Sequence, residues 1–388
     1  MIDHELMLSD TLKDIKPSGI RKFFDLLSDM GDVTALTVGQ PDFVTPWHIR
    51  EAAIQSLERG HTYYTSNSGL PELRSEIARY MNRRFGLDYS AGEVLVTVGG
   101  SEAIDVAIRS LVNPGDEVII PMPSFVCYEP IARMAGAVPV IINTKAENGF
   151  KLTADELRQA ITPRTKVLVL PYPNNPTGAI LERDELEKLA EVLRDTNIAI
   201  LSDEIYAELT YGKTHVSIAS IDGMRERTII ASGFSKAYAM TGWRLGYICA
   251  PAAWTKQMTK LHQYAIMCAP TVSQFAAIEA LKNGDEDIAE MCAEYNRRRV
   301  FIAEGLERIG LPVMIPEGAF YIYPYIGGFG LSSEEFCQRL LMEEKCAIVP
   351  GTAFGECGEG YARISYAYSV KHIEEALEKI ERFINKLK

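Results

Sequence analysis

The sequence lacks the features that mark membrane-spanning, secreted or nucleic-acid-binding proteins. No run approaches the roughly 20 apolar residues that cross a bilayer, and the acidic stretch from Met1 to Asp10 contains no apolar segment of a secretory signal. No cluster of lysine and arginine that could follow a phosphate backbone is present, and the formal net charge is −12. We therefore expect a soluble, cytoplasmic protein that binds neither membranes nor nucleic acid.

Cysteine and histidine are sparse and scattered. The seven cysteines show no C-x-x-C spacing, which indicates reduced thiols that serve packing rather than a disulfide framework. The six histidines show no spacing typical of metal ligands. We therefore predict no metal site.

The chain has 388 residues, and this length exceeds what one hydrophobic core usually organises. Its composition, 47% hydrophobic and 24% charged, is that of a globular protein. From about Val94 to Cys249, short apolar runs alternate with amphipathic stretches. This βα rhythm predicts an α/β fold, with a mostly parallel sheet covered by helices on both faces. In such sheets ligands bind beyond the carboxyl ends of the strands.

After about Gly284 the pattern changes. It predicts a long charged helix from Asp285 to Arg308, two aromatic-rich strands (AFYIYPYI and YARISYAY) and a closing helix from Val370 to Lys388. We therefore expect a large domain over residues 46–284 and a smaller α+β domain over residues 285–388. Residues 1–45, with a helix expected over SGIRKFFDLL, form an N-terminal arm that joins the small domain.

The stretch SGFSKAYAMTGWRLG, residues 232–246, follows a predicted strand and carries the most informative chemistry. Lys236 lies among small residues, with Arg244 eight positions later. A lysine in a confined loop can lose its proton and become nucleophilic enough to form an imine. A guanidinium can bind a phosphate through two parallel hydrogen bonds. For an isolated lysine, a surface position in a turn is the alternative.

This stretch resembles, at every position from Gly233 to Gly246, the lysine signature of the class-I aminotransferases among the fold-type I pyridoxal-phosphate enzymes. Four further motifs follow the order found in that family, and the resemblance covers nearly the whole chain. They are VGQPDF at 38–43, YYTSNSGLPELR at 63–74, PYPNNPTG at 171–178 and SDEIY at 202–206. The resemblance implies a fold-type I transaminase in which Lys236 holds pyridoxal 5′-phosphate.

The resemblance also implies the catalytic residues Lys236, Asp203 and Tyr206. Asp203 ends an apolar strand, where its carboxylate can pair with the protonated ring nitrogen of the cofactor; a helix cap or turn is the alternative. Tyr206 and Asn175 are then donors to the phenolate oxygen of the cofactor. The full set of implied cofactor-binding residues is Tyr64, Gly100, Ser101, Glu102, Phe125, Asn175, Asp203, Tyr206, Ser235, Lys236 and Arg244.

Among these assignments, the anion site at the helix start has a physical basis of its own, and Phe125 and Tyr64 follow from the resemblance. Gly100, Ser101 and Glu102 open a helix directly after a strand, and the free N–H groups there favour an anion such as the cofactor phosphate. Phe125 matches the aromatic that stacks on the cofactor, although an isolated phenylalanine is more often a core residue. Tyr64 matches the tyrosine that reaches the phosphate of a neighbouring subunit, so we expect a homodimer with shared active sites.

The implied substrate-binding residues are Gly39, Asn175 and Arg363. Arg363 lies in an otherwise apolar strand, where an arginine needs an anionic partner. The resemblance assigns that partner as the α-carboxylate of the substrate, and a structural salt bridge is the alternative.

These features predict transfer of an amino group from an L-amino acid to a 2-oxo acid, commonly 2-oxoglutarate. Within the family, PYPNNPTG, LSDEIYAELTYGKTHVSIAS and KLHQYAIMCAP most resemble the N-acetyl-LL-diaminopimelate aminotransferases of lysine biosynthesis. An aromatic or broad-specificity aminotransferase is the first alternative, and a carbon-sulfur β-lyase with the same cofactor is the second. Ser101 stands where aspartate-preferring relatives can carry a lysine, so narrow aspartate specificity is not expected.

Overall fold

The computed structural model describes residues 2–17, 19 and 31–388. Of the helix predicted over SGIRKFFDLL, every residue except Gly19 lies outside this described part.

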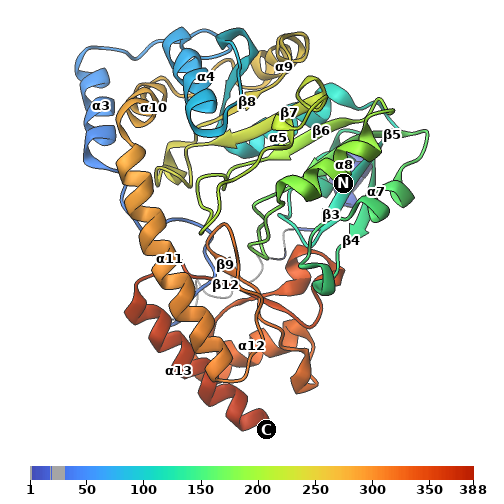
Figure 1. The fold of residues 1–388 in the computed structure, drawn as a ribbon, viewed down its shortest axis with the longest axis vertical. Helices are drawn as coiled ribbons and strands as arrows, with labels where there is room; N and C mark the ends of the chain where they lie inside the picture. The colour runs from blue at the N-terminus through green and yellow to red at the C-terminus, as the bar shows by residue number, and fades with distance from the viewer. Residues whose placement is uncertain (1, 18, 20–30) are drawn as a thin grey trace.

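A seven-stranded sheet forms the centre of the larger part of the protein (Figure 1). Each apolar run predicted as a strand between residues 94 and 249 is a strand of this sheet. Strand β8 runs antiparallel to both of its neighbours, and the other neighbouring pairs are parallel, as the mostly parallel prediction requires. In spatial order the strands are β2 (Val94–Thr97), β8 (Gly246–Cys249), β7 (Thr228–Gly233), β6 (Ala199–Asp203), β5 (Thr165–Leu170), β3 (Glu117–Met122) and β4 (Val138–Asn143).

Helices cover both faces of the sheet because alternate strand residues point to opposite sides. Along β5, Val167 and Val169 pack in one apolar cluster, whereas Leu168 and Leu170 pack in another. The first cluster includes α5 (Gly99–Leu111), α6 (Tyr128–Met134) and α9 (Ala252–Ala265). The second includes α7 (Ala154–Ala160) and α8 (Arg183–Leu193). The sheet is therefore the middle layer of three.

Three more helices pack near the β2 end of the sheet. They share one apolar cluster with β2, β7 and β8, and Figure 1 shows them along the upper edge of the molecule. They are α3 (Trp47–Glu58), α4 (Pro71–Phe85) and α10 (Thr271–Asn283).

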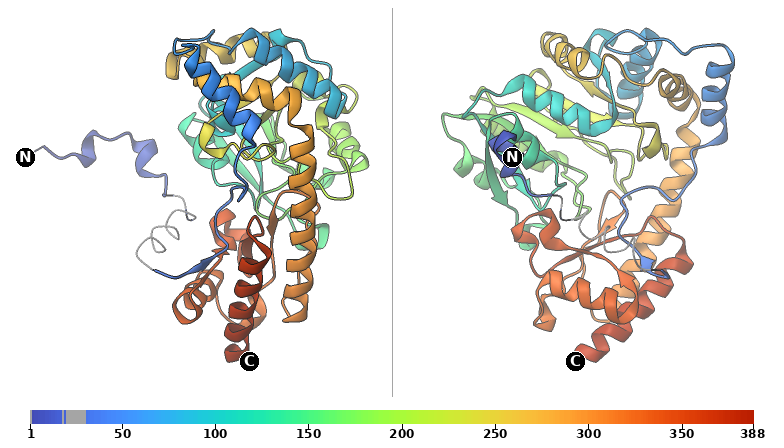
Figure 2. Two further views of the ribbon diagram at one scale, coloured as in Figure 1. Left: turned by 90° about the vertical axis from the view of Figure 1, so that its left-hand side faces the viewer. Right: turned by 180° about the vertical axis from the view of Figure 1, so that it is seen from behind.

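The C-terminal part has its own small sheet and core. Strand β12 lies between β9 and β11 and is antiparallel to both. Helix α11 runs from the large sheet down to this part, where it packs beside α13 (Figures 1 and 2). The elements are α11 (Asp285–Arg308), β9 (Tyr321–Ile322), α12 (Ser333–Glu344), β10 (Cys346–Ala347), β11 (Val349–Pro350), β12 (Ala362–Ser365) and α13 (Val370–Leu387).

The segment before the large sheet also joins the C-terminal part. Strand β1 (Thr34–Ala35) pairs in parallel with β10, and Leu36 belongs to the C-terminal apolar cluster. Two short helical segments, η1 (Glu5–Met7) and α1 (Asp10–Lys13), precede it. On this basis we keep the division at residues 45/46 and 284/285 as a proposal.

Among the described residues, no helix is long and apolar enough to cross a membrane. The same ranges contain no group of three histidine, cysteine, aspartate or glutamate side chains placed to hold a metal ion. All seven cysteines are free thiols.

Candidate active site

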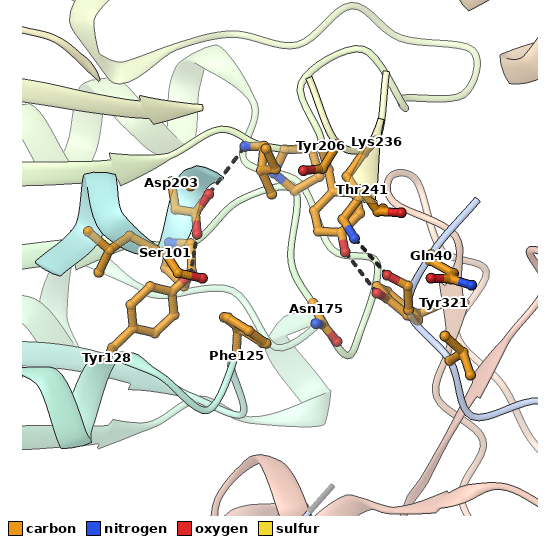
Figure 3. Close-up of a pocket in the computed structure, with 18 of the residues that line it drawn as sticks. Gln40, Ser101, Phe125, Tyr128, Asn175, Asp203, Tyr206, Lys236, Thr241 and Tyr321 are labelled. Carbon is orange, nitrogen blue, oxygen red and sulfur yellow. Dashed lines mark hydrogen bonds between the residues drawn. The ribbon is translucent and has the colours of Figure 1, made fainter. Parts of the chain in front are cut away.

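A cavity of about 320 Å³ lies where the carboxyl ends of the parallel strands face the small sheet (Figure 3). Its volume is within the usual range for small-molecule sites. All of the predicted site residues except Glu102 and Tyr64 line it. They are Gly39, Gly100, Ser101, Phe125, Asn175, Asp203, Tyr206, Ser235, Lys236, Arg244 and Arg363.

Lys236 lies just beyond β7, in the loop predicted from the sequence. Its Nζ donates a hydrogen bond to the carbonyl oxygen of Gly39 at 2.6 Å. Burial, together with the positive charges of Arg363 and Arg244, lowers the pKa of Lys236 from 10.5 to about 8. About a tenth of this amine is therefore neutral, and so nucleophilic, at pH 7, far more than for an ordinary lysine.

Asp203 is the last residue of β6 and is only 8% exposed. Its carboxylate accepts hydrogen bonds from the Tyr128 hydroxyl at 2.6 Å and from the backbone N–H of Ile205 at 3.2 Å. Burial nevertheless raises the pKa of Asp203, and no lysine or arginine within the described ranges forms a salt bridge with it. A positively charged ring nitrogen would supply the missing partner.

The start of α5 and Arg244 form a site suited to an anion. Gly99 has φ +78°, and a Cβ there would lie 2.7 Å from a guanidinium nitrogen of Arg244, so glycine allows the close approach. Arg244 is held by donating to the carbonyl oxygen of Thr241 at 3.0 Å. Because the first N–H groups of a helix lack partners within the helix, helix start and guanidinium together favour a phosphate. Ser101 and Ser235 line the same cavity.

Glu102 does not turn its side chain into the cavity. Its carboxylate accepts a hydrogen bond from the backbone N–H of Val98 and lies 2.7 Å from Nδ1 of the fully buried His262. The predicted role of Glu102 rested on its backbone N–H at the helix start, and that role stays a prediction. The side chain instead stabilises the start of α5, because it contacts both the strand-to-helix turn at Val98 and His262 of α9.

Tyr64 is likewise outside the cavity, with 79% of its surface exposed in the single chain. The prediction that it serves a neighbouring subunit therefore stays a prediction.

Arg363 lies in β12 and is 2% exposed. Its guanidinium donates to Oδ1 of Asn175 at 3.0 Å and to the carbonyl oxygen of Thr37, and its Nε has no partner. No carboxylate in the part of the chain that the structure describes forms a salt bridge with Arg363, so the structural salt bridge considered above is not found. A buried guanidinium with a free N–H beside a cavity can bind a carboxylate.

Two tyrosines complete the site, and only one was predicted. The hydroxyls of Tyr206 and Tyr321 lie 2.8 Å apart (Figure 3). Tyr321 belongs to β9 and lies within the aromatic-rich run AFYIYPYI, a signal that was available in the sequence. The lining residues that sequence reasoning missed are Thr37, Val38, Gln40, Ile104, Tyr128, Pro171, Pro173, Ile205, Thr241 and Tyr321.

Comparisons with known proteins agree with this geometry. Residues 31–380 match the family model described as "Aminotransferase class I and II". The chain is 53% identical to YugH of Bacillus subtilis, whose name gives an aminotransferase and no substrate, over 98% of both chains. It is 45% identical to the "Probable N-acetyl-LL-diaminopimelate aminotransferase" of the same organism, over 98% of this chain and 97% of that protein.

Relatives with other named substrates are about as similar. The aspartate aminotransferase of Pyrococcus abyssi is 43% identical over 99% of this chain and 100% of its own. The crystal structure of an aromatic aminotransferase from Pyrococcus horikoshii OT3 matches with a TM-score of 0.90 and 42% identity, over 94% of this chain and 100% of that one. The predicted fold type and enzyme class are therefore confirmed, and the chain belongs to the class I and II aminotransferases, the pyridoxal-phosphate-dependent transaminases.

Proposed function

We propose that this protein transfers an amino group from an L-amino acid to a 2-oxo acid, with pyridoxal 5′-phosphate held on Lys236. One observation carries the proposal: Lys236, with a pKa of about 8, lines one cavity together with a buried guanidinium and a buried carboxylate that has no salt-bridge partner among the described residues. A reactive amine, a partner for a cationic ring and a partner for a carboxylate are the three groups that amino transfer requires.

The described residues fit this cofactor. Asp203 is a buried carboxylate that lacks a cation, the start of α5 and Arg244 favour a phosphate, and Phe125 offers an aromatic face in the same cavity. When bound, pyridoxal phosphate supplies an aldehyde that condenses with amines and a ring that accepts electrons from the α-carbon of the substrate.

Each side chain then has a task of its own. Arg363 binds the α-carboxylate, because its guanidinium lines the cavity and forms no salt bridge with a carboxylate of the described residues. This contact fixes the orientation of the α-carbon relative to Lys236. As a free amine, Lys236 would act as the general base that takes the proton from that carbon, and as an ammonium it would act as the general acid that gives the proton to the cofactor. A pKa near 8 suits both roles at neutral pH.

Asp203 and Tyr206 stabilise charges on the cofactor, whereas Lys236 transfers the proton of the substrate. Asp203 keeps the ring nitrogen protonated, because a cation would relieve the cost of its buried carboxylate. Tyr206 and Asn175 both line the cavity, and in this proposal they donate hydrogen bonds to the phenolate oxygen.

For the amino donor we propose N-acetyl-LL-2,6-diaminopimelate, which would place the enzyme in lysine biosynthesis. The three resembling sequence stretches and the relative at 45% identity support this choice. Aromatic amino acids and aspartate are the rival donors, since relatives with those names are 42% and 43% identical. We propose 2-oxoglutarate as the acceptor.

A single half-reaction tests both reaction and donor. The enzyme is loaded with pyridoxal phosphate and mixed in turn with N-acetyl-LL-diaminopimelate, phenylalanine, aspartate and cystathionine, and loss of the cofactor absorbance is followed. We expect the fastest conversion with N-acetyl-LL-diaminopimelate and none in Lys236→Ala. Faster conversion by phenylalanine or aspartate would reassign the donor. Release of pyruvate from cystathionine, with the absorbance unchanged, would instead support a β-lyase.

We also propose a homodimer in which Tyr64 contributes to the site of the neighbouring subunit. The exposure of Tyr64, and of other large side chains such as Trp47 and Tyr264, supports a covered surface in the assembly. Sedimentation should show a dimer, and Tyr64→Phe should bind pyridoxal phosphate more weakly than Tyr63→Phe. Equal affinities in the two variants would remove Tyr64 from the site.

A further inference from the structure

Tyr321 is a buried residue to which the sequence assigned no role. It is 1% exposed, belongs to β9 of the small sheet and lines the cavity. Its hydroxyl lies 2.8 Å from the hydroxyl of Tyr206, which follows β6 of the large sheet. This hydrogen bond therefore joins the two sheets at the site.

Once the cofactor is bound, the hydrogens available decide which of the two tyrosine hydroxyls donates to the other. Each phenol has one hydrogen to donate and can also accept. Burial raises the pKa of both Tyr206 and Tyr321, so both keep that hydrogen. If Tyr206 donates its hydrogen to the phenolate oxygen of the cofactor, its own oxygen is left to accept from Tyr321. A hydroxyl that accepts in this way becomes a stronger donor.

The ring of Tyr321 has a second contact within the site. The guanidinium carbon of Arg363 lies 4.6 Å from the ring centroid, within the range of a cation–π interaction. A Cβ at residue 39 would collide with the Tyr321 hydroxyl, so Gly39 leaves the space that this hydroxyl occupies. Tyr321 thus touches a proposed cofactor ligand, the proposed carboxylate ligand and the segment that holds Lys236.

We propose that Tyr321 is a positioning residue whose hydroxyl donates to Tyr206, and so directs the Tyr206 hydrogen to the cofactor, while its ring holds the Arg363 guanidinium in place. This inference rests on the proposed function. Tyr321 then couples the small sheet, which carries Arg363, to the residues that follow the strands of the large sheet.

The test uses the enzyme loaded with pyridoxal phosphate and follows its absorbance as a function of pH. Loss of the proton on the nitrogen that joins Lys236 to the cofactor leaves the phenolate charge without its neighbouring cation. A donor to that oxygen consequently favours the deprotonated form, and weakening the donor raises the titration midpoint. Tyr206→Phe should raise it by about 1 to 2 pH units, and Tyr321→Phe by about 0.3.

Two comparisons separate positioning from a general structural effect. In a Tyr206→Phe background, Tyr321→Phe should produce no further shift, because the hydroxyl through which it acts is gone. The matched control is Tyr323→Phe, two residues along the chain. It removes a buried hydroxyl that has no hydrogen-bond partner, and it should leave the midpoint at the wild-type value. Since phenylalanine keeps the ring over Arg363, KM for the amino donor should stay within about twofold in Tyr321→Phe while kcat falls.

Failure of this inference is distinguishable from failure of the proposed function. A wild-type enzyme that binds no cofactor at Lys236 would overturn the function itself. If the wild-type enzyme titrates as expected but the midpoint of Tyr321→Phe is unchanged or lowered, only the role of Tyr321 is overturned. The same holds if the shift persists in the Tyr206→Phe background.

Discussion

Nζ of Lys236 donates a 2.6 Å hydrogen bond to the carbonyl oxygen of Gly39, a residue 197 positions earlier in the chain. The first residue belongs to the loop after β7, and the second lies next to the segment that carries β1. The contact brings the reactive amine to the VGQPDF motif, of which Gly39 was predicted to bind the substrate. An imine at Lys236 keeps at most one N–H, so we expect cofactor binding to weaken this hydrogen bond.

Replacement of Asp203 by asparagine should lower the rate of amino transfer by a factor of about 10² to 10³. The neutral amide keeps the shape of the side chain but cannot hold a positive charge on the ring nitrogen. Cofactor binding should persist, since Lys236 and the anion site are untouched. Stopped-flow measurement of the half-reaction gives the rate, and a near-normal value would mean that another group protonates the ring.

Arg363→Lys should raise KM about 10- to 100-fold for every amino donor. A lysine carries the charge but cannot make two parallel hydrogen bonds to a carboxylate. Steady-state kinetics with a monocarboxylic and a dicarboxylic donor provide the check. If only the dicarboxylic donor is affected, Arg363 binds the distal carboxylate instead.

Gly99→Ala should weaken the affinity for pyridoxal phosphate about tenfold, because alanine disfavours a positive φ and its Cβ would displace the Arg244 guanidinium. The matched control is Gly92→Ala, before the same strand, where a Cβ would meet only the Ser90 hydroxyl at 3.7 Å. Equilibrium titration of the cofactor-free variants measures both affinities. Equal losses in the two variants would argue against an anion site at the start of α5.

Lys236→Met should stabilise the cofactor-free protein at pH 7. The folded-state pKa of Lys236 is lowered from 10.5 to about 8, so the unfolded chain binds more protons between these values. The charged lysine consequently destabilises the fold below pH 8, by at most about 3 kcal/mol, and this effect fades as the pH rises toward 10.5. Thermal unfolding of both proteins from pH 7 to pH 10 should show a difference in Tm that narrows. A constant difference would contradict the lowered pKa.

The large sheet could be predicted from the sequence because its strands are short apolar runs with helical stretches between them. Asp203 is the last residue of β6, where it pairs opposite Ala231 of the neighbouring strand β7, and Lys236 lies just after β7. Since parallel strands end at one edge, the sequence order alone placed both residues at that edge. The helix from Asp285 to Arg308 was also predicted with its observed bounds, because its charged, periodic pattern is long.

Contacts between distant elements could not be predicted in the same way. The Tyr206–Tyr321 pair spans 115 positions and depends on how the two sheets pack, which no local pattern encodes. Glu102 illustrates a second limit. The sequence indicated that a helix begins there, but not that the carboxylate would turn toward His262 rather than toward the cavity.

The central claim is that pyridoxal phosphate is bound covalently through Lys236. The most direct measurement is borohydride reduction of the loaded enzyme, which fixes an imine as a stable amine, followed by digestion and mass spectrometry. The account predicts the cofactor mass on the peptide that contains Lys236, and no labelled peptide in Lys236→Ala. A label on another lysine, or retention of the label in Lys236→Ala, would contradict the account.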